Sequence, residues 1–153
     1  ALDRIIPDCI RALEDDRPII IRSPQSIRPW QHVLEPLGGY MMLAQRMWNE
    51  PTRYCEGWNF GPKTESISTV WEIATRVVAS YGKGMLKDLS DPHVLHEAKL
   101  LMLDISKAKF KLGWEPRKNN EETVALTVVW YRKYNIMNGY DLCVEQINEY
   151  VAK

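Results

Sequence analysis

Apolar residues recur at helical spacing along most of this chain, and this constrains its fold more than any other feature. Residues 3–15 and 66–82 show the pattern most clearly. Apolar positions three and four residues apart lie on one side of a helix, which must then be buried against a partner. Comparable stretches at 34–49, 106–112, 120–134 and 142–151 predict a helix-rich chain. In residues 3–15 the predicted buried face consists of Ile5, Ile6, Cys9, Ile10 and Leu13.

Short apolar runs between the predicted helices indicate strands. Residues 18–21 read Pro-Ile-Ile-Ile after a turn and predict a buried strand, and 99–103 predict another. Residues 57–62, Gly-Trp-Asn-Phe-Gly-Pro, are expected to form a strand that ends in a turn. The predicted fold is therefore mixed α/β and helix-rich, with short strands among several packed helices. The length suits one domain, residues 1–153.

Capping residues set the expected helix boundaries. Asp3 is the expected cap of the first helix and Ser66 that of the helix that ends at Gly82. The glycine pair Gly38 and Gly39 weakens the helix over 34–49, so we expect close packing against a neighbour there. The helix over 142–151 is amphipathic and suits either oligomer contacts or closure of the core, and we favour closure.

Composition excludes several functions. Lys plus Arg equals Asp plus Glu at 20 each, which argues against a broad nucleic-acid surface. No apolar run approaches the roughly 20 residues that cross a bilayer. The sequence shows no secretory signal, and its cysteines suggest neither a disulfide framework nor a zinc site, so we expect a cytoplasmic protein. Because it begins at Ala1 without a methionine, we expect it to be part of a longer protein.

Common catalytic and cofactor motifs are absent from the sequence. It contains no Gly-x-Gly-x-x-Gly, no Gly-x-Ser-x-Gly and no His-Glu-x-x-His. His93 lies near His96 and Glu97, but a metal site needs three or four ligands in a fixed geometry, so we expect no metal. The sequence therefore supplies no candidate catalytic residue.

Arg28 is a candidate for anion binding, because an arginine fork suits a carboxylate or a phosphate. On pattern alone, a solvated surface charge is the more common outcome. The same holds for neighbouring Trp30 and His32, for which core packing is expected. Asn59 is either a turn asparagine or an amide presented to a ligand, and the pattern favours the turn. His96 and Glu97 have two interpretations. They mark the exposed edge of a strand, or they form a site for sugar hydroxyls or a phosphate.

A resemblance changes this balance. Four motifs occur in order: Arg28-Pro-Trp-Gln-His-Val33, Trp58-Asn-Phe-Gly61, Leu103-Asp-Ile-Ser-Lys-Ala108 and Leu112-Gly-Trp-Glu-Pro116. They resemble the C-terminal, substrate-binding half of the extended short-chain dehydrogenase/reductase enzymes that act on nucleotide sugars. Many members have Arg-Asp-Trp-x-Tyr-Val as the first motif, whereas Pro29 and His32 stand here. With RPWQHVLEPLGGY and HEAKLLMLD, this departure is similar to the CDP-glucose 4,6-dehydratases.

The resemblance implies how the chain contacts a nucleotide sugar. Arg28 matches the arginine that holds the diphosphate, and Asn59 is expected near the same group. His96 and Glu97 match the place of a phosphate- or ribose-binding group, where many relatives carry an arginine instead.

The resemblance also implies walls around the base and ribose. The segment around Arg4, Ile5 and Ile6 and the strand from Ile19 to Arg22 match these walls. Ile19 and Ile21 are expected to contact the cytosine through apolar surface rather than through base-specific hydrogen bonds.

The implied reaction converts CDP-glucose to CDP-4-keto-6-deoxyglucose and water, a step toward the deoxysugars of lipopolysaccharide O-antigens. Hydride passes from C4 to NAD, water leaves across C5 and C6, and hydride returns to C6. The resemblance places the NAD loop and the catalytic residues in an N-terminal Rossmann domain, expected upstream of this chain, through which members pair as homo-oligomers. This segment alone is therefore expected to be inactive.

Two alternatives remain open at this point. A GDP-mannose 4,6-dehydratase or another nucleotide-sugar dehydratase or epimerase would share the architecture and the arginine. The second alternative, from another functional class, is that the chain is a non-catalytic nucleotide-sugar-binding or interaction module.

Overall fold

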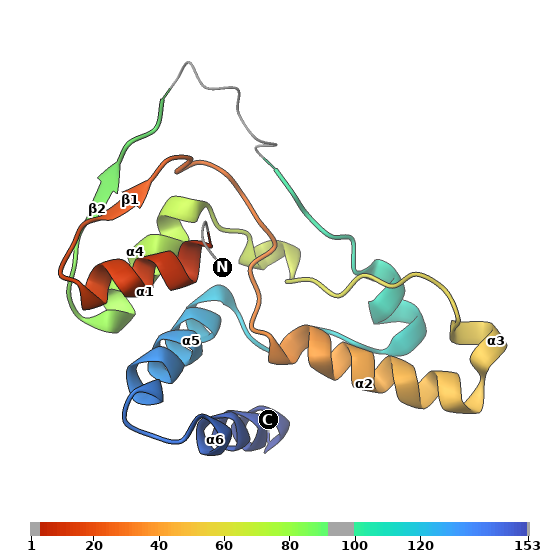
Figure 1. Cartoon of the computed structure of the whole chain (residues 1–153). Helices are drawn as coiled ribbons and strands as arrows, with labels where there is room; N and C mark the ends of the chain where they lie inside the picture. The colour runs from red at the N-terminus through yellow and green to blue at the C-terminus, as the bar shows by residue number, and fades with distance from the viewer. Residues whose placement is uncertain (1–3, 92–99, 153) are drawn as a thin grey trace.

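The structure is a computed structural model that describes residues 4–91 and 100–152. Most of the described chain is helical (Figure 1). The strands are β1 (Ile19–Ile21) and β2 (Leu86–Asp88), and single helical turns form at η1 (Thr64–Ser66) and η2 (Ala108–Leu112). The α-helices are α1 (Ile5–Glu14), α2 (Leu34–Asn49), α3 (Pro51–Tyr54), α4 (Val70–Tyr81), α5 (Asn120–Tyr134) and α6 (Gly139–Ala152).

The two strands pair in parallel, with Ile19 opposite Leu86 and Ile21 opposite Asp88. Successive side chains of a strand point to opposite faces. Ile19 and Ile21 are accordingly buried, whereas Ile20 between them is exposed. The small sheet thus has one face on the core and one face open.

The main core lies between α1, β1, α4 and α5, which gather in one half of the molecule (Figure 1). Helix α4 is central because it contacts α1, β1 and α5. Its start is fixed by a capping box, in which Thr69 and Glu72 satisfy each other's backbone N–H groups. Its buried face consists of Ile73, Ala74 and Val77.

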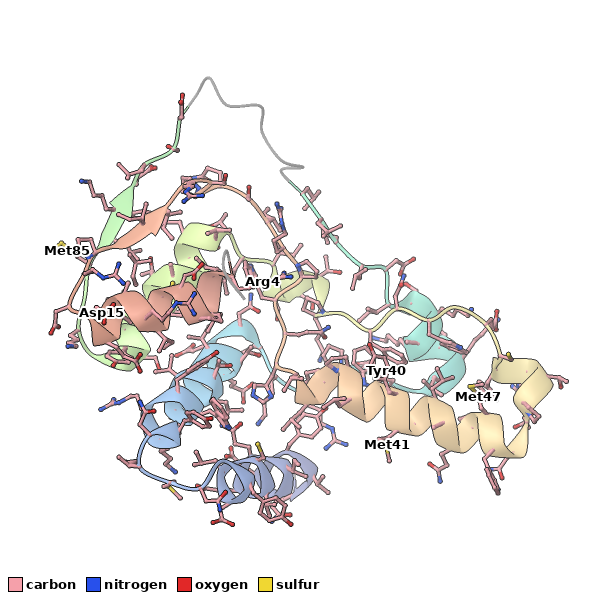
Figure 2. The ribbon with its side chains drawn as sticks, in the orientation of Figure 1. Arg4, Asp15, Tyr40, Met41, Met47 and Met85 are labelled. Atoms are coloured by element: carbon pink, nitrogen blue, oxygen red, sulfur yellow. The ribbon has the colours of Figure 1, made fainter. Side chains whose placement is uncertain are left out.

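A second apolar cluster forms where α2 projects away from the main core toward α3 and η2 (Figure 1). Phe60 is its centre: its ring makes edge contacts with Tyr40, at 5.4 Å between centroids, and with Trp114, at 4.9 Å. Figure 2 labels Tyr40 and Met41 at different places around α2, and both side chains are largely exposed, at 56% and 73%. Gly39 lets the helix approach this ring, because a Cβ there would lie 2.4 Å from Phe60 Cδ1.

The two parts of the molecule are joined by a buried carboxylate. Glu35, at 0% exposure, accepts hydrogen bonds from the backbone N–H of Arg117 at 3.0 Å and of Lys118 at 2.8 Å. It also accepts one from the Tyr150 hydroxyl at 2.9 Å. The first turn of α2 is thereby tied to the segment before α5 and to the end of α6.

The predicted fold class and most helices are confirmed. The helix over 34–49 has the predicted bounds, and the helices over 66–82 and 106–112 end at left-handed Gly82 and Gly113. Close packing at Gly39 is also confirmed. Helix α6 packs on α5 and buries Leu142 and Tyr150, as closure of the core requires.

Several predicted boundaries were wrong. Helix α1 begins at Ile5 with Arg4 at the capping position, whereas the predicted cap, Asp3, lies outside the described residues. Ser66 lies in η1, and Thr69 caps α4 instead, because its hydroxyl reaches the N–H of Glu72. Helix α6 begins at Gly139, three residues before the predicted start.

Two predicted strands do not form. Residues 57–62 have no regular structure, and the carbonyl of Phe60 accepts a side-chain bond from Gln31 rather than a strand partner. Of residues 100–103, only Leu100 forms a bridge, with Ile27. Pro29 follows shortly after Ile27 and has no N–H to extend a ladder. Strand β2 was not predicted, because Leu-Lys-Asp is not an apolar run.

The described residues include no helix long and apolar enough to cross a bilayer.

The contact between α2 and Phe60 gives a stability prediction. Gly39→Ala should lower the free energy of unfolding by about 1–3 kcal/mol, because the added methyl group must displace a packed ring. Gly57→Ala is the matched control, since a Cβ there meets nothing within 4 Å. Urea unfolding measures both variants, and identical midpoints would contradict this packing.

The buried carboxylate gives a second prediction. In Glu35→Gln an amide NH₂ replaces one accepting oxygen and faces donors, so we expect a loss of about 1–3 kcal/mol or more. Tyr150→Phe removes one of the three bonds and should cost less. A Glu35→Gln variant as stable as the wild type in urea unfolding would show that this site does not hold the helices together.

Candidate functional site

The backbone of Ile27 joins three segments that are far apart in the sequence. Ile27 forms an antiparallel bridge with Thr69 and a parallel bridge with Leu100. Its carbonyl accepts from the N–H of Leu101 at 3.2 Å, and the carbonyl of neighbouring Ser26 accepts from Val70 at 2.9 Å. The position of Arg28, the next residue, is therefore set by pairing on both sides.

Arg28 lines a small cavity of about 20 Å³ beside this junction. Its side chain is half-buried, and its Nη1 donates to the Ile27 carbonyl at 2.9 Å. Pro29 and Pro62 form part of the wall, and Lys63 adds a second positive charge. Among the described residues, no Asp or Glu lines this cavity. An arginine fork with a second positive charge in the same wall suits a bound anion.

Lys63 is held loosely at the rim of the cavity. Its Nζ lies 3.7 Å from Glu115 Oε2, while Lys109 lies closer to the same carboxylate, at 2.7 Å. The hydrogen bond from Lys109 lowers the pKa of Glu115, so this carboxylate is ionised at neutral pH.

Asn59 is exposed and contacts the segment that follows this junction. Its Nδ2 donates to the carbonyl of Asp104 at 3.2 Å, which ties the segment 57–63 to the segment 100–105. Gly61 continues this contact, because a Cβ there would lie 2.9 Å from the Cβ of Leu103. Asn59 does not line the Arg28 cavity.

Trp30, Gln31 and His32 hold the Arg28 loop in place. Trp30 Nε1 donates to the Ser68 carbonyl at 3.1 Å, and Gln31 Nε2 donates to the Phe60 carbonyl at 2.8 Å. His32 is buried, and this burial lowers the pKa of its imidazole. The predicted core roles of Trp30 and His32 are confirmed.

Strand β1 presents different residues from those the sequence suggested. Ile19 and Ile21, at 2% and 1% exposure, belong to the main core, whereas Ile20 is 44% exposed. Arg22 follows the strand and is exposed on the same side as Ile20 by strand alternation. A base-binding role of Ile19 and Ile21 stays a prediction, and from the core they would act by positioning Ile20 and Arg22.

The remaining predicted site residues lie apart from the Arg28 cavity or outside the described residues. Arg4 is exposed at the amino-terminal end of α1 (Figure 2), and Ile5 packs against the main core. His96 and Glu97 fall outside the described residues. In residues 4–91 and 100–152, no cluster of His, Cys, Asp and Glu is arranged to hold a metal ion.

Lys63 and Ile20 were missed by sequence reasoning. The position of Lys63 directly after the turn residues Gly61 and Pro62 is the one sequence feature that points to it. Its approach to Arg28 depends on the tertiary fold. The sequence does not single out Ile20. In a run of three isoleucines, the pattern does not show which side chains face the core.

The sequence comparison shows a similar enzyme. No protein-family model matches the chain. It is 43% identical over 155 aligned residues to a CDP-glucose 4,6-dehydratase of Salmonella typhimurium. This chain is similar to a nucleotide-sugar dehydratase. The alignment covers 99% of this chain but 43% of the relative, so the chain spans less than half of that protein's length.

Solved structures of similar fold agree with this result. A dTDP-glucose 4,6-dehydratase of Bacillus anthracis, in complex with NAD, matches with a TM-score of 0.70 at 19% identity, over 86% of this chain and 39% of that one. A UDP-glucuronic acid 4-epimerase of Bacillus cereus, in complex with UDP-glucuronic acid and NAD, matches with a TM-score of 0.70 at 18% identity, over 86% and 40%. The chain thus shares its fold with part of these two enzymes.

The buried histidine gives a pH prediction. Because burial lowers the pKa of folded His32 below its ordinary value of 6.5, the unfolded state binds a proton more readily. The resulting stability is fully present above pH 6.5 and is lost as the pH falls through the lower folded pKa. His32→Gln should therefore show a flatter decline in unfolding free energy between about pH 7 and 5. If the unfolding free energies of the wild type and of His32→Gln fall in parallel with pH, His32 does not have a lowered pKa in the folded state.

Proposed function

We propose that this chain is the substrate-binding part of an NAD-dependent CDP-glucose 4,6-dehydratase. The identity to the Salmonella typhimurium enzyme over 99% of the chain supports this function. The observation that carries it is the half-buried guanidinium of Arg28, which the pairing of Ile27 holds at a fixed position with Lys63 in the same cavity wall. The diphosphate carries the only permanent charges of CDP-glucose, so a guanidinium at a fixed backbone position is the chemistry that its recognition requires.

In the proposed complex, the guanidinium of Arg28 binds the diphosphate through two parallel hydrogen bonds. Pairing of Ile27 on both sides fixes where this guanidinium can reach. Asn59 acts from the neighbouring segment, near the same diphosphate. Binding of this remote group orients the glucose for the reaction, and correct orientation is worth about 7–11 kcal/mol of a barrier.

The open face of β1 is the proposed wall for the base and ribose. Ile20 offers exposed apolar surface and Arg22 offers donors, whereas Ile19 and Ile21 anchor the strand in the core. Arg4 and Ile5 at the start of α1 complete this wall in the proposal, with His96 and Glu97 near the ribose or phosphate.

NAD supplies the hydride chemistry in this proposal, and no residue of this chain is assigned to it. The chain contributes affinity and orientation, packed against a Rossmann domain of the same protein that also mediates homo-oligomer contacts. The proposed enzyme is cytoplasmic and supplies deoxysugar precursors of lipopolysaccharide. Its partners are small molecules rather than nucleic acid.

The base is the part of the substrate that needs a direct test. The structural neighbours act on dTDP-glucose and UDP-glucuronic acid, so the fold is compatible with several bases. Competition among CDP-glucose, GDP-mannose and UDP-glucose for the full-length protein should favour CDP-glucose. Preference for another nucleotide sugar would keep the Arg28 role and change the substrate.

Arg28→Ala tests the diphosphate role in the full-length protein. We expect KM for CDP-glucose to rise about 10- to 100-fold, because a hydrogen bond to a charged group is lost, while NAD affinity stays unchanged. Steady-state kinetics and calorimetric titration with CDP and with NAD measure the two effects. Arg28→Lys should recover part of the loss, since an ammonium cannot reproduce the fork.

Arg53→Ala is the matched control for removal of an arginine. Arg53 pairs with Glu50 at 2.9 Å on the exposed surface of α3 and does not line the Arg28 cavity. Its substitution should leave KM unchanged. If Arg28→Ala also leaves KM and CDP affinity unchanged, Arg28 is a surface charge and the proposed role is wrong.

A further inference from the structure

The side chain of Lys63 lies between the Arg28 cavity and the carboxylate of Glu115. It lines the cavity, and its Nζ lies 3.7 Å from Glu115 Oε2. This separation exceeds the length of an ordinary hydrogen bond, which is about 2.7–3.2 Å. Both side chains of the pair are open to solvent, with exposed fractions of 48% and 42%. Solvent screens such a pair, so Lys63 loses little when it leaves Glu115.

Glu115 has a second and closer partner. Lys109 Nζ lies 2.7 Å from Glu115 Oε1. The hydrogen bond between them lowers the pKa of the Glu115 carboxyl group and raises the pKa of the Lys109 ammonium group. Both groups are therefore charged at neutral pH. Glu115 stays paired with Lys109 when Lys63 moves away, so the movement leaves no carboxylate without a countercharge.

The backbone at Lys63 is fixed, although its side chain is largely exposed. The Lys63 carbonyl accepts from the N–H of Ser66 at 2.9 Å, and the Ser66 carbonyl accepts from Asn120 Nδ2. Two residues before Lys63, Gly61 packs closely against Leu103. Movement of the ammonium group therefore needs only rotation of an exposed side chain, which is much faster than a rearrangement of the loop.

We propose that Lys63 is a second ligand for the substrate diphosphate and that it exchanges Glu115 for this group when the nucleotide sugar binds. Lys109 keeps Glu115 paired after the exchange. Glu115 competes with the diphosphate for one ammonium group, so it lowers the apparent affinity by the fraction of molecules in which Lys63 is available. This inference rests on the proposed function and adds to it a competitor that adjusts the affinity of the same site.

Single variants of the full-length protein, titrated with CDP in a calorimeter, test both parts of the proposal. Lys63→Met should weaken CDP binding about fivefold, and Lys63→Arg should restore most of the loss because the charge is kept. Glu115→Gln should tighten CDP binding about twofold, because it frees Lys63. Urea unfolding should show Lys63→Met to be as stable as the wild type, since the lost pair is exposed.

Glu56→Gln is the matched control for removal of a carboxylate. Glu56 pairs with Lys107 at 2.8 Å, at an exposed fraction close to that of Glu115, and it does not line the Arg28 cavity. Its substitution should leave the affinity for CDP unchanged.

A double variant separates competition for Lys63 from a general effect of charge. Loss of any nearby negative charge favours an anion, so a tighter Glu115→Gln variant alone does not establish the exchange. In Lys63→Met/Glu115→Gln the affinity for CDP should equal that of Lys63→Met, because Glu115 then has no ligand to withhold. If Glu115→Gln tightens binding equally in the Lys63→Met background, Glu115 acts only through its charge and the exchange is wrong.

Arg28→Ala distinguishes failure of this inference from failure of the proposed function. If Arg28→Ala weakens CDP binding and Lys63→Met does not, Lys63 is not a ligand and only the exchange is wrong. If neither variant weakens CDP binding, the diphosphate does not bind at this cavity, and the proposed role of Arg28 is wrong as well.

Discussion

The structure depends on the carboxylate of Glu35, which is fully buried at the first turn of α2. It accepts hydrogen bonds from residues 82 to 115 positions away in the sequence. A buried charge is costly unless it is paired and hydrogen-bonded, so these three donors must be in place together. Arg117 adds to the closure, since its Nη1 donates to the Tyr150 carbonyl at 2.9 Å. One side chain thus couples α2, the approach to α5 and the end of α6.

The same corner of the chain positions the candidate site. Between Arg28 and Glu35, Trp30 and Gln31 donate to carbonyls of Ser68 and Phe60, so the loop is fixed to two segments. Arg28 is therefore presented from a rigid loop rather than from a mobile one. Arginine at a fixed position recognises a planar anion more selectively than a flexible cation does. Rigidity at this corner links the packing of α2 to substrate orientation in the proposed function.

Helices were predictable to different degrees at their ends and in their interiors. The apolar face of α4 follows from spacing alone, but its start shifted from Ser66 to Thr69, since several serines and threonines precede it. Which of them caps depends on where the chain leaves the Ile27 junction. The strands were harder to predict from the sequence. Leu100 and Ile27 pair through their backbones, and short segments that pair in this way have no distinctive side-chain pattern.

The sequence by itself determined the helix-rich fold class and singled out Arg28 through its motif. Both depend on local signals, namely the spacing of apolar residues and the order of a few residue types. Only the tertiary structure decided that Lys63 lies beside Arg28 and that Ile20, rather than Ile19 or Ile21, faces outward. It also decided that Glu35 is buried. These features arise from contacts between distant segments, and such contacts form only when the chain has packed.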